Sequence, residues 1–147
     1  MPAKQYLSQV QYLMSKVRRA DERIEYLRTE AEGLKGIRYD KLRVQSSPNP
    51  DPIADYIAKL EEAEEKERQL KLAYINTYDT IRSQIEQIEP QLFQQILAYR
   101  YLDGWKLERI ADHLHYEYGW IRTCHGRALQ EFARMHMNEH TKKDIEV

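Results

Sequence analysis

Apolar residues recur at steps of three and four along two long stretches of the chain. This spacing places the apolar side chains on one stripe of an α-helix, as in a heptad seam. The first stretch predicts a helix from about residue 4 to residue 34. The second predicts a long helix after Asp51 and Pro52, a good N-cap followed by the residue favoured at the first helical position. The two seams consist of Leu7, Val10, Met14, Val17, Ile24, Leu27, Ala31 and Leu34, and of Tyr56, Leu60, Ala63, Leu70, Tyr74, Tyr78, Ile81, Ile85 and Ile88.

A turn-rich connector at residues 36–50 separates these helices, and the charges on its two sides are opposite. Residues 1–44 hold 10 basic and 6 acidic side chains, a difference of +4, whereas residues 45–89 hold 5 and 10, a difference of −5. Two amphipathic helices of complementary charge most simply fold back as a long antiparallel helical hairpin. The hairpin is either a stiff spacer or an association surface, because two helices leave apolar surface for a third helix or a second copy. We therefore expect a homo-oligomer.

Three shorter helices are predicted downstream of Pro90. The first ends at Asp103-Gly104, a helix-stopping pair. The second covers residues 106–114, and the third runs from residue 118 to about residue 135. Residues 115–117 form a tight turn between them. A short helix, a three-residue turn and a longer helix are typical of a helix-turn-helix.

The residues of this part resemble a known DNA-binding module. The stretch YLDGWKLERIADHL at 101–114 resembles the start of region 4 of bacterial sigma-70-type factors, where DG, two residues, LEEIA, two residues and L is typical. Ile121-Arg122, followed by Arg127-Ala128-Leu129, resembles the VRQIEARAL part of the same module. With its charged helical region, the whole chain is also similar to small phage and prophage proteins of Gram-positive bacteria. These include the ArpU- and RinA-like late-gene regulators and a related uncharacterised family.

The resemblance implies that the helix beginning at Tyr118 enters the DNA major groove. By position it implies that Tyr118, Gly119, Arg122 and Thr123 contact DNA. Three further candidate contact residues lie on or near the same face: Trp120, His125 and Arg127. The spacing agrees in part, since Tyr118, Arg122 and His125 are predicted to share a face away from the apolar residues. On that face Arg122 is suited to pair bidentately with guanine, and Thr123 to meet a thymine methyl or a phosphate. The alternative is an ordinary solvated helix face.

Several positions depart from the region 4 pattern. His115 stands where the turn usually has glycine, and histidine is among the residues more often found at positive φ. Glu117 replaces the usual Ser or Thr cap. Tyr118 and Gly119 replace residues that read bases in sigma factors, so the promoter preference of those factors should not be transferred. We expect Gly119 to permit close approach to a phosphate and Gly126 to serve close packing, since a glycine within a helix costs about 1 kcal/mol relative to alanine.

Other chemistries find little support in the sequence. The five histidines lack the spacing of a metal site, and the single cysteine, Cys124, falls on the buried face of the third helix. There is no Gly-rich phosphate loop and no distinctive carboxylate pair, so we expect no enzyme, no cofactor and no metal. No apolar run approaches the roughly 18 residues of a membrane helix, and no signal peptide is recognisable, so we expect a cytoplasmic protein without a membrane partner.

Residues 90–147 hold 8 basic and 8 acidic side chains, so this part is formally neutral. A neutral domain should bind DNA weakly by itself. Additional affinity for DNA would then have to come from dimerisation, from the positively charged residues 1–44, or from RNA polymerase. RNA polymerase is therefore a further candidate partner.

Together these patterns predict an all-α protein with three parts. Residues 1–89 form the helical hairpin for oligomerisation or partner binding, residues 90–137 a trihelical sigma-region-4-like helix-turn-helix DNA-binding domain, and residues 138–147 a tail. The expected function is sequence-specific binding of double-stranded DNA in phage or prophage transcription control, as an activator of late genes. Two alternatives stay open. One is a small terminase subunit, which would form a ring-shaped oligomer, and the other is an interaction protein that binds polymerase or another sigma factor.

Overall fold

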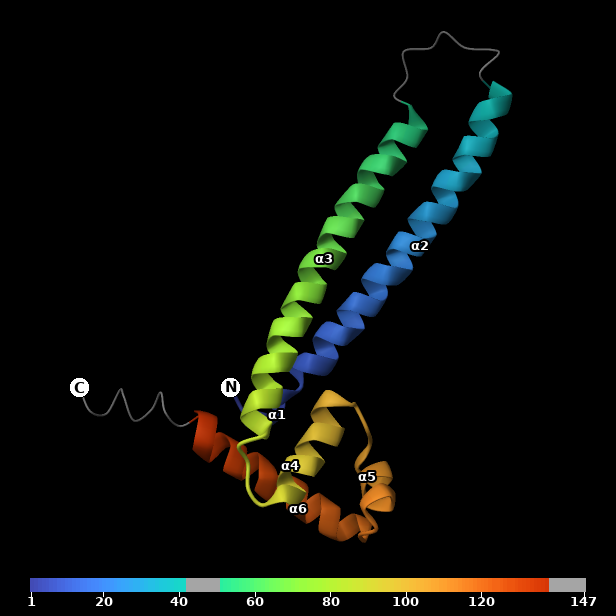
Figure 1. Ribbon diagram of the computed structural model, residues 1–147. Coiled ribbons are helices and arrows are strands. Elements are labelled where there is room, and N and C mark those ends of the chain that lie inside the picture. Colours follow the sequence, from blue (N-terminus) through green and yellow to red (C-terminus); the bar gives the residue numbers. More distant parts are fainter. Residues whose placement is uncertain (42–50, 138–147) are drawn as a thin grey trace, which may run out of the picture. The chain divides into compact units, whose positions relative to one another are not determined.

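The protein is all-helical, as predicted. A computed structural model describes residues 1–41 and 51–137, with the side chains of 1–34 and 51–137, and these ranges contain no β-strand. Figure 1 labels the helices α1 (Ala3–Leu7), α2 (Gln9–Lys41), α3 (Pro52–Ile85), α4 (Gln91–Leu97), α5 (Leu107–Leu114) and α6 (Tyr118–Phe132). Two π-helical turns, Ala98–Leu102 and Ala133–Met137, extend α4 and α6.

The first predicted helix is divided at Ser8 and is longer than expected. The Ser8 hydroxyl donates to the Lys4 carbonyl oxygen at 2.6 Å at the end of α1. α2 then continues to residue 41, so residues 36–41 of the predicted connector are helical. A glycine such as Gly36 need not end a helix, because its cost there is only about 1 kcal/mol. The rest of the predicted connector and the predicted tail lie outside the described residues.

The start of α3 confirms the predicted cap. The carboxylate of Asp51 accepts a hydrogen bond from the Ile53 backbone N–H at 3.0 Å. Pro52 occupies the first helical position, where its missing N–H leaves no donor without a partner. This bond satisfies one of the N–H groups that the first turn of a helix leaves unpaired.

The chain forms two compact units. Unit 1 combines Met1–Tyr12 with the residues from Tyr74 onward, and unit 2 is Leu13–Ala73. Both α2 and α3 therefore contribute residues to each unit. The predicted domain boundary between residues 89 and 90 is a different division of the chain, and it stays a prediction.

In unit 2, segments of α2 and α3 pair in opposite directions. Asp21 on α2 pairs with Lys71 on α3 at 3.7 Å. Two turns further along α2, Arg28 pairs with Glu64, which lies two turns earlier on α3, at 3.4 Å. Rising residue numbers on α2 thus meet falling numbers on α3, as Figure 1 also shows. The buried apolar residues of this unit are Ile24, Leu27, Ala31 and Ile53.

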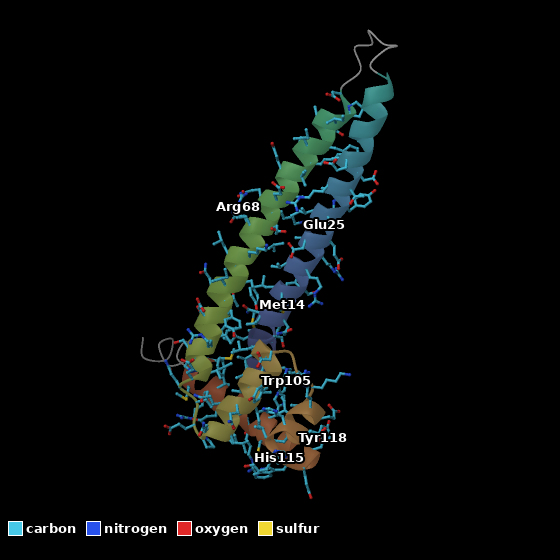
Figure 2. The ribbon with its side chains drawn as sticks, turned by 45° about the vertical axis from the view of Figure 1, so that its right-hand side comes forward. Met14, Glu25, Arg68, Trp105, His115 and Tyr118 are labelled. Carbon is cyan, nitrogen blue, oxygen red and sulfur yellow. The ribbon has the colours of Figure 1, made fainter. Side chains whose placement is uncertain are left out.

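The predicted seam is only partly buried in unit 2. Met14, expected in the seam, is 39% exposed, and its position on α2 can be followed in Figure 2. Leu60, Ala63 and Leu70 on α3 are half-buried. Two paired helices cover only a narrow strip of each other, so regular apolar spacing alone does not ensure burial.

Unit 1 contains the main apolar core, and this core joins distant parts of the sequence. Residues from α1, the start of α2, the end of α3, α4 and α6 pack in one cluster that includes Leu7, Val10, Ile81, Ile85, Ile88, Leu97, Tyr101, Ala128 and Phe132. A second cluster consists of Ile96, Ile110, Ala111, Ile121 and Cys124. The first cluster fastens α6 to the N-terminal residues, and the second holds α5 against α4 and α6.

Candidate nucleic-acid interface

α4 and its π-helical turn end at Asp103-Gly104, as predicted. Gly104 has a φ of 74°, a left-handed conformation that glycine adopts without a Cβ clash. A Cβ at this position would lie 2.8 Å from the Gln11 side-chain oxygen. The Gln11 amide in turn donates to the Leu102 carbonyl oxygen at 3.0 Å. The positive φ therefore favours glycine at position 104, and a side chain there would also have to displace the end of the Gln11 side chain.

α5 ends in a tight turn at His115. This residue adopts φ 61° and ψ 44°, which confirms the expectation that histidine replaces glycine at a positive φ. The Tyr116 N–H donates to the Ala111 carbonyl oxygen at 3.0 Å, and the His115 N–H to that of Asp112 at 3.4 Å. These two bonds form a Schellman motif, which satisfies the last carbonyl groups of the helix. The turn fixes the direction in which the chain enters α6.

α6 begins at Tyr118, and its first turn lacks a side-chain cap. Glu117 occupies the cap position and makes no capping hydrogen bond. The buried face of the helix consists of Ile121, Cys124, Ala128 and Phe132. Cys124 is 1% exposed, and burial raises the pKa of its thiol, so the thiolate needed for reactivity is disfavoured. This confirms its predicted place in the core.

Six of the seven predicted contact residues are exposed: Tyr118, Gly119, Trp120, Arg122, Thr123 and Arg127. Figure 2 marks Tyr118 and His115 where α5 and α6 meet.

At 100° per residue, the face opposite the buried one carries Gly119 and Thr123 at its centre, together with Gly126. Arg122 lies toward one edge of this face and Arg127 toward the other. Between Gly119 and Arg127 the exposed side of α6 is thus a strip of small residues with a cation along each edge, and one turn beyond Gly126 the exposed Gln130 lies on the same strip.

Both cations rest against aromatic rings. The guanidinium carbon of Arg122 lies 5.9 Å from the centre of the Tyr118 ring. That of Arg127 lies 5.6 Å from the Trp120 ring, which is 44% exposed. Such contacts limit the side-chain entropy that a partner would otherwise have to remove. These contacts therefore favour the observed side-chain positions of both arginines before any partner binds.

His125 does not share this exposed face, contrary to the spacing argument. Its Nε2 lies 2.7 Å from the Tyr101 hydroxyl, and the two rings stack at 5.7 Å. Burial, with smaller contributions from the positive charges of Arg100 and Lys4, lowers the pKa of His125 to about 4. At neutral pH the ring is therefore uncharged and turned toward the core of unit 1.

Gly126 also differs from the expectation of close packing. It is exposed, and a Cβ built there would meet no atom within 4 Å. Gly119 has the same open surroundings. The Thr123 hydroxyl between them donates to the Gly119 carbonyl oxygen at 3.1 Å, within its own helix. Neither glycine is therefore required by packing among the described residues of unit 1.

A second cationic position, on α5, was missed by the sequence analysis. The guanidinium carbon of Arg109 lies 3.9 Å from the Trp105 ring centre, and Trp105 stacks on Tyr99 at 4.5 Å with an angle of 13°. His113 meets the Trp105 ring edge-on at 5.2 Å. The four-residue spacing of Arg109 and His113 was the available signal, since such residues share one face of α5, and Trp105 lies just before this helix.

Within residues 1–41 and 51–137, no group of three or more His, Cys, Asp or Glu side chains is placed to hold a metal ion. None of the helices in that part of the chain combines the length and apolar character that crossing a membrane requires.

Acidic residues also lie near the exposed face of α6. Glu117 precedes it, and Glu108 and Asp112 are exposed on α5. The strip of small residues and its two arginines therefore lie within a region of mixed charge.

Comparison of the chain with protein-family models, with curated proteins and with solved structures finds no match.

Proposed function

We propose that the protein is a sequence-specific DNA-binding protein in which α6 is the recognition helix of a sigma-region-4-like helix-turn-helix. The observation that carries this proposal is the exposed face of α6 described above. On this face, a strip of small residues is flanked by Arg122 and Arg127. The helix that carries it is the longer one, and it follows a short helix and a three-residue turn. A groove-entering helix needs a surface that lets its backbone come close to the bases and cations that reach base edges or phosphates.

The proposed biological role is transcription control in a phage or prophage, as an activator of late genes that acts with RNA polymerase. The resemblance of residues 101–129 to region 4 supports this role. Residues 90–147 have a net formal charge of zero. Because phosphate neutralisation supplies much of the affinity for DNA, this supports a need for a second component that adds affinity. In this proposal the antiparallel segments of α2 and α3 form a helical hairpin that binds a second copy of the chain or a partner protein.

The test is selection of bound fragments from the genome that encodes the protein, followed by quantitative binding to the enriched site. We expect one promoter-like site. Arg122→Ala should weaken binding to it by about 1–3 kcal/mol, roughly 5- to 150-fold, because a bidentate arginine–guanine contact is worth this much. A matched control is Arg134→Ala, which removes the same charge from a guanidinium that hydrogen-bonds to Glu131.

The control should bind the site within about twofold of the unmodified protein. Equal binding by Arg122→Ala and the unmodified protein would show that α6 is not the recognition helix. Failure to enrich any site, combined with retention of polymerase in a pull-down, would favour the interaction protein instead.

A further inference from the structure

The paired segments of α2 and α3 in unit 2 have two chemically different sides. On one side, opposite charges bridge the helices, as Asp21 does with Lys71 and Arg28 with Glu64. These pairs satisfy the charges of that side within the chain itself.

The other side of the pair carries a groove with cations on both rims. The groove has a cavity of about 270 Å³, and its apolar lining comes from Ala20 on α2 and from Ala63 and Leu70 on α3. Its charged lining consists of Lys16, Arg19, Arg23 and Lys66. All four cations are exposed, and the three apolar residues are half-buried.

Three of the four cations of the groove, Arg19, Arg23 and Lys66, make no ion pair with an acidic side chain among the described residues. Like charges face each other across the groove, which is unfavourable for the isolated helix pair. Arg23 contacts the Tyr26 ring at 5.7 Å. The groove therefore presents a charge arrangement that an added acidic segment would complement.

We propose that this groove binds an acidic amphipathic α-helix of a partner protein. A helix with apolar residues at steps of three and four would place them against Ala20, Ala63 and Leu70, and carboxylates on its two flanks would reach the cations of both rims. The lining residues of α2 span about 10 Å along the helix axis, the length of two turns. A nucleic-acid backbone would use the cations but would leave the apolar floor without a partner, so the acidic helix is favoured.

This inference goes beyond the proposed DNA-binding function and does not depend on it. The probe is a synthetic helical peptide of about 18 residues, with leucines on one face and glutamates on both flanks, labelled with fluorescein. Binding to the full chain is followed by fluorescence anisotropy. A second peptide of identical composition carries the leucines in an order that forms no apolar face.

The variant is Arg19→Glu, and the matched control is Arg18→Glu. The two positions are adjacent and exposed, and the charge change is the same, but only Arg19 lines the groove. We expect Arg19→Glu to weaken peptide binding by at least about tenfold and Arg18→Glu by less than about threefold. The rearranged peptide should bind at least about tenfold more weakly than the amphipathic one. Lys66→Glu, on the opposite rim, should reproduce the loss seen for Arg19→Glu.

Four results would overturn the proposal. Equal losses for Arg19→Glu and Arg18→Glu, or equal binding of the two peptides, would show that only long-range charge attraction is at work. Displacement of the peptide by a DNA duplex whose binding Arg19→Glu also weakens would identify a nucleic-acid surface. A concentration-dependent dimer that Arg19→Glu dissociates, measured by sedimentation, would assign the groove to a second copy of this chain.

Discussion

The contact between His125 and Tyr101 predicts how the stability of unit 1 depends on pH. The folded protein lowers the pKa of His125 from 6.5 to about 4, mainly because the ring is removed from solvent. Between these two values the unfolded chain binds more protons than the folded one. Stability is therefore fully present above pH 6.5 and is lost as the pH falls toward 4.

The size of the effect follows from the two pKa values. Lowering the pH from 7.5 to 4.5 with a pKa of 6.5 unfolded and about 4 folded would cost about 2.5 kcal/mol. The His125 ring is only partly buried, and solvent screens part of the unfavourable interaction with its charge. We halve the value for this reason and expect a loss of about 1.2 kcal/mol.

The assay is urea unfolding of the full chain at pH 7.5 and pH 4.5, compared with His125→Gln. Glutamine can still bond to the Tyr101 hydroxyl but does not titrate, so the difference between the two proteins isolates the histidine. We expect this difference to change by about 1.2 kcal/mol between the two pH values, to the disadvantage of the unmodified protein at pH 4.5. Tyr101→Phe should keep most of the pH dependence, because burial is its first cause, and should lower stability by about 1 kcal/mol at both pH values.

If the unfolding free energies of the unmodified protein and His125→Gln differ by the same amount at both pH values, His125 does not have a lowered pKa in the folded protein. An NMR titration of this ring with its midpoint near 6.5, the ordinary pKa of histidine, would lead to the same conclusion.

Substitutions at four further positions test individual elements through urea unfolding. Gly126→Ala should raise the free energy of unfolding by about 0.5–1 kcal/mol, because a Cβ there meets no other atom; a lower stability would mean that this surface is packed. His115→Gly should raise it by about 0.5–1 kcal/mol, since glycine adopts the positive φ of the turn without strain, and an unchanged value would argue against the left-handed turn. Asp51→Ala should lower it by about 1 kcal/mol through loss of the cap on α3, whereas Asp51→Ser should restore most of that loss. Phe132→Ala should lower it by about 3–5 kcal/mol, because the side chain is fully buried, and a loss below 1 kcal/mol would contradict the core of unit 1.

Local signals predicted the C-terminal helices well. The stop at Gly104, the turn at His115 and the inward face that includes Cys124 each depend on a few neighbouring residues. Helix caps, a left-handed residue and a period of 3.6 are properties of short stretches, so they can be recognised from sequence.

Other features depend on long-range contacts, and these escaped the sequence analysis. His125 has a spacing that fits the exposed face, but Tyr101, 24 positions earlier, draws it inward. Met14 fits the seam by spacing, but α3 covers too little of α2 to bury it. Gly126 was expected to pack closely, although no described atom lies within 4 Å of a Cβ built there. Periodicity gives the direction of a side chain from its helix, whereas burial depends on what lies opposite.

The shared core of unit 1 has a consequence for the order of folding during synthesis. Leu7 and Val10 emerge first from the ribosome, but they pack with Ala128 and Phe132, which are made more than a hundred residues later. The N-terminal residues therefore lack the native neighbours that α6 supplies until α6 has been released from the ribosome. Formation of this core closes a very long loop, which slows folding compared with helices that pair locally. A nascent chain arrested before α6 would expose these apolar side chains and would be a natural substrate for chaperones.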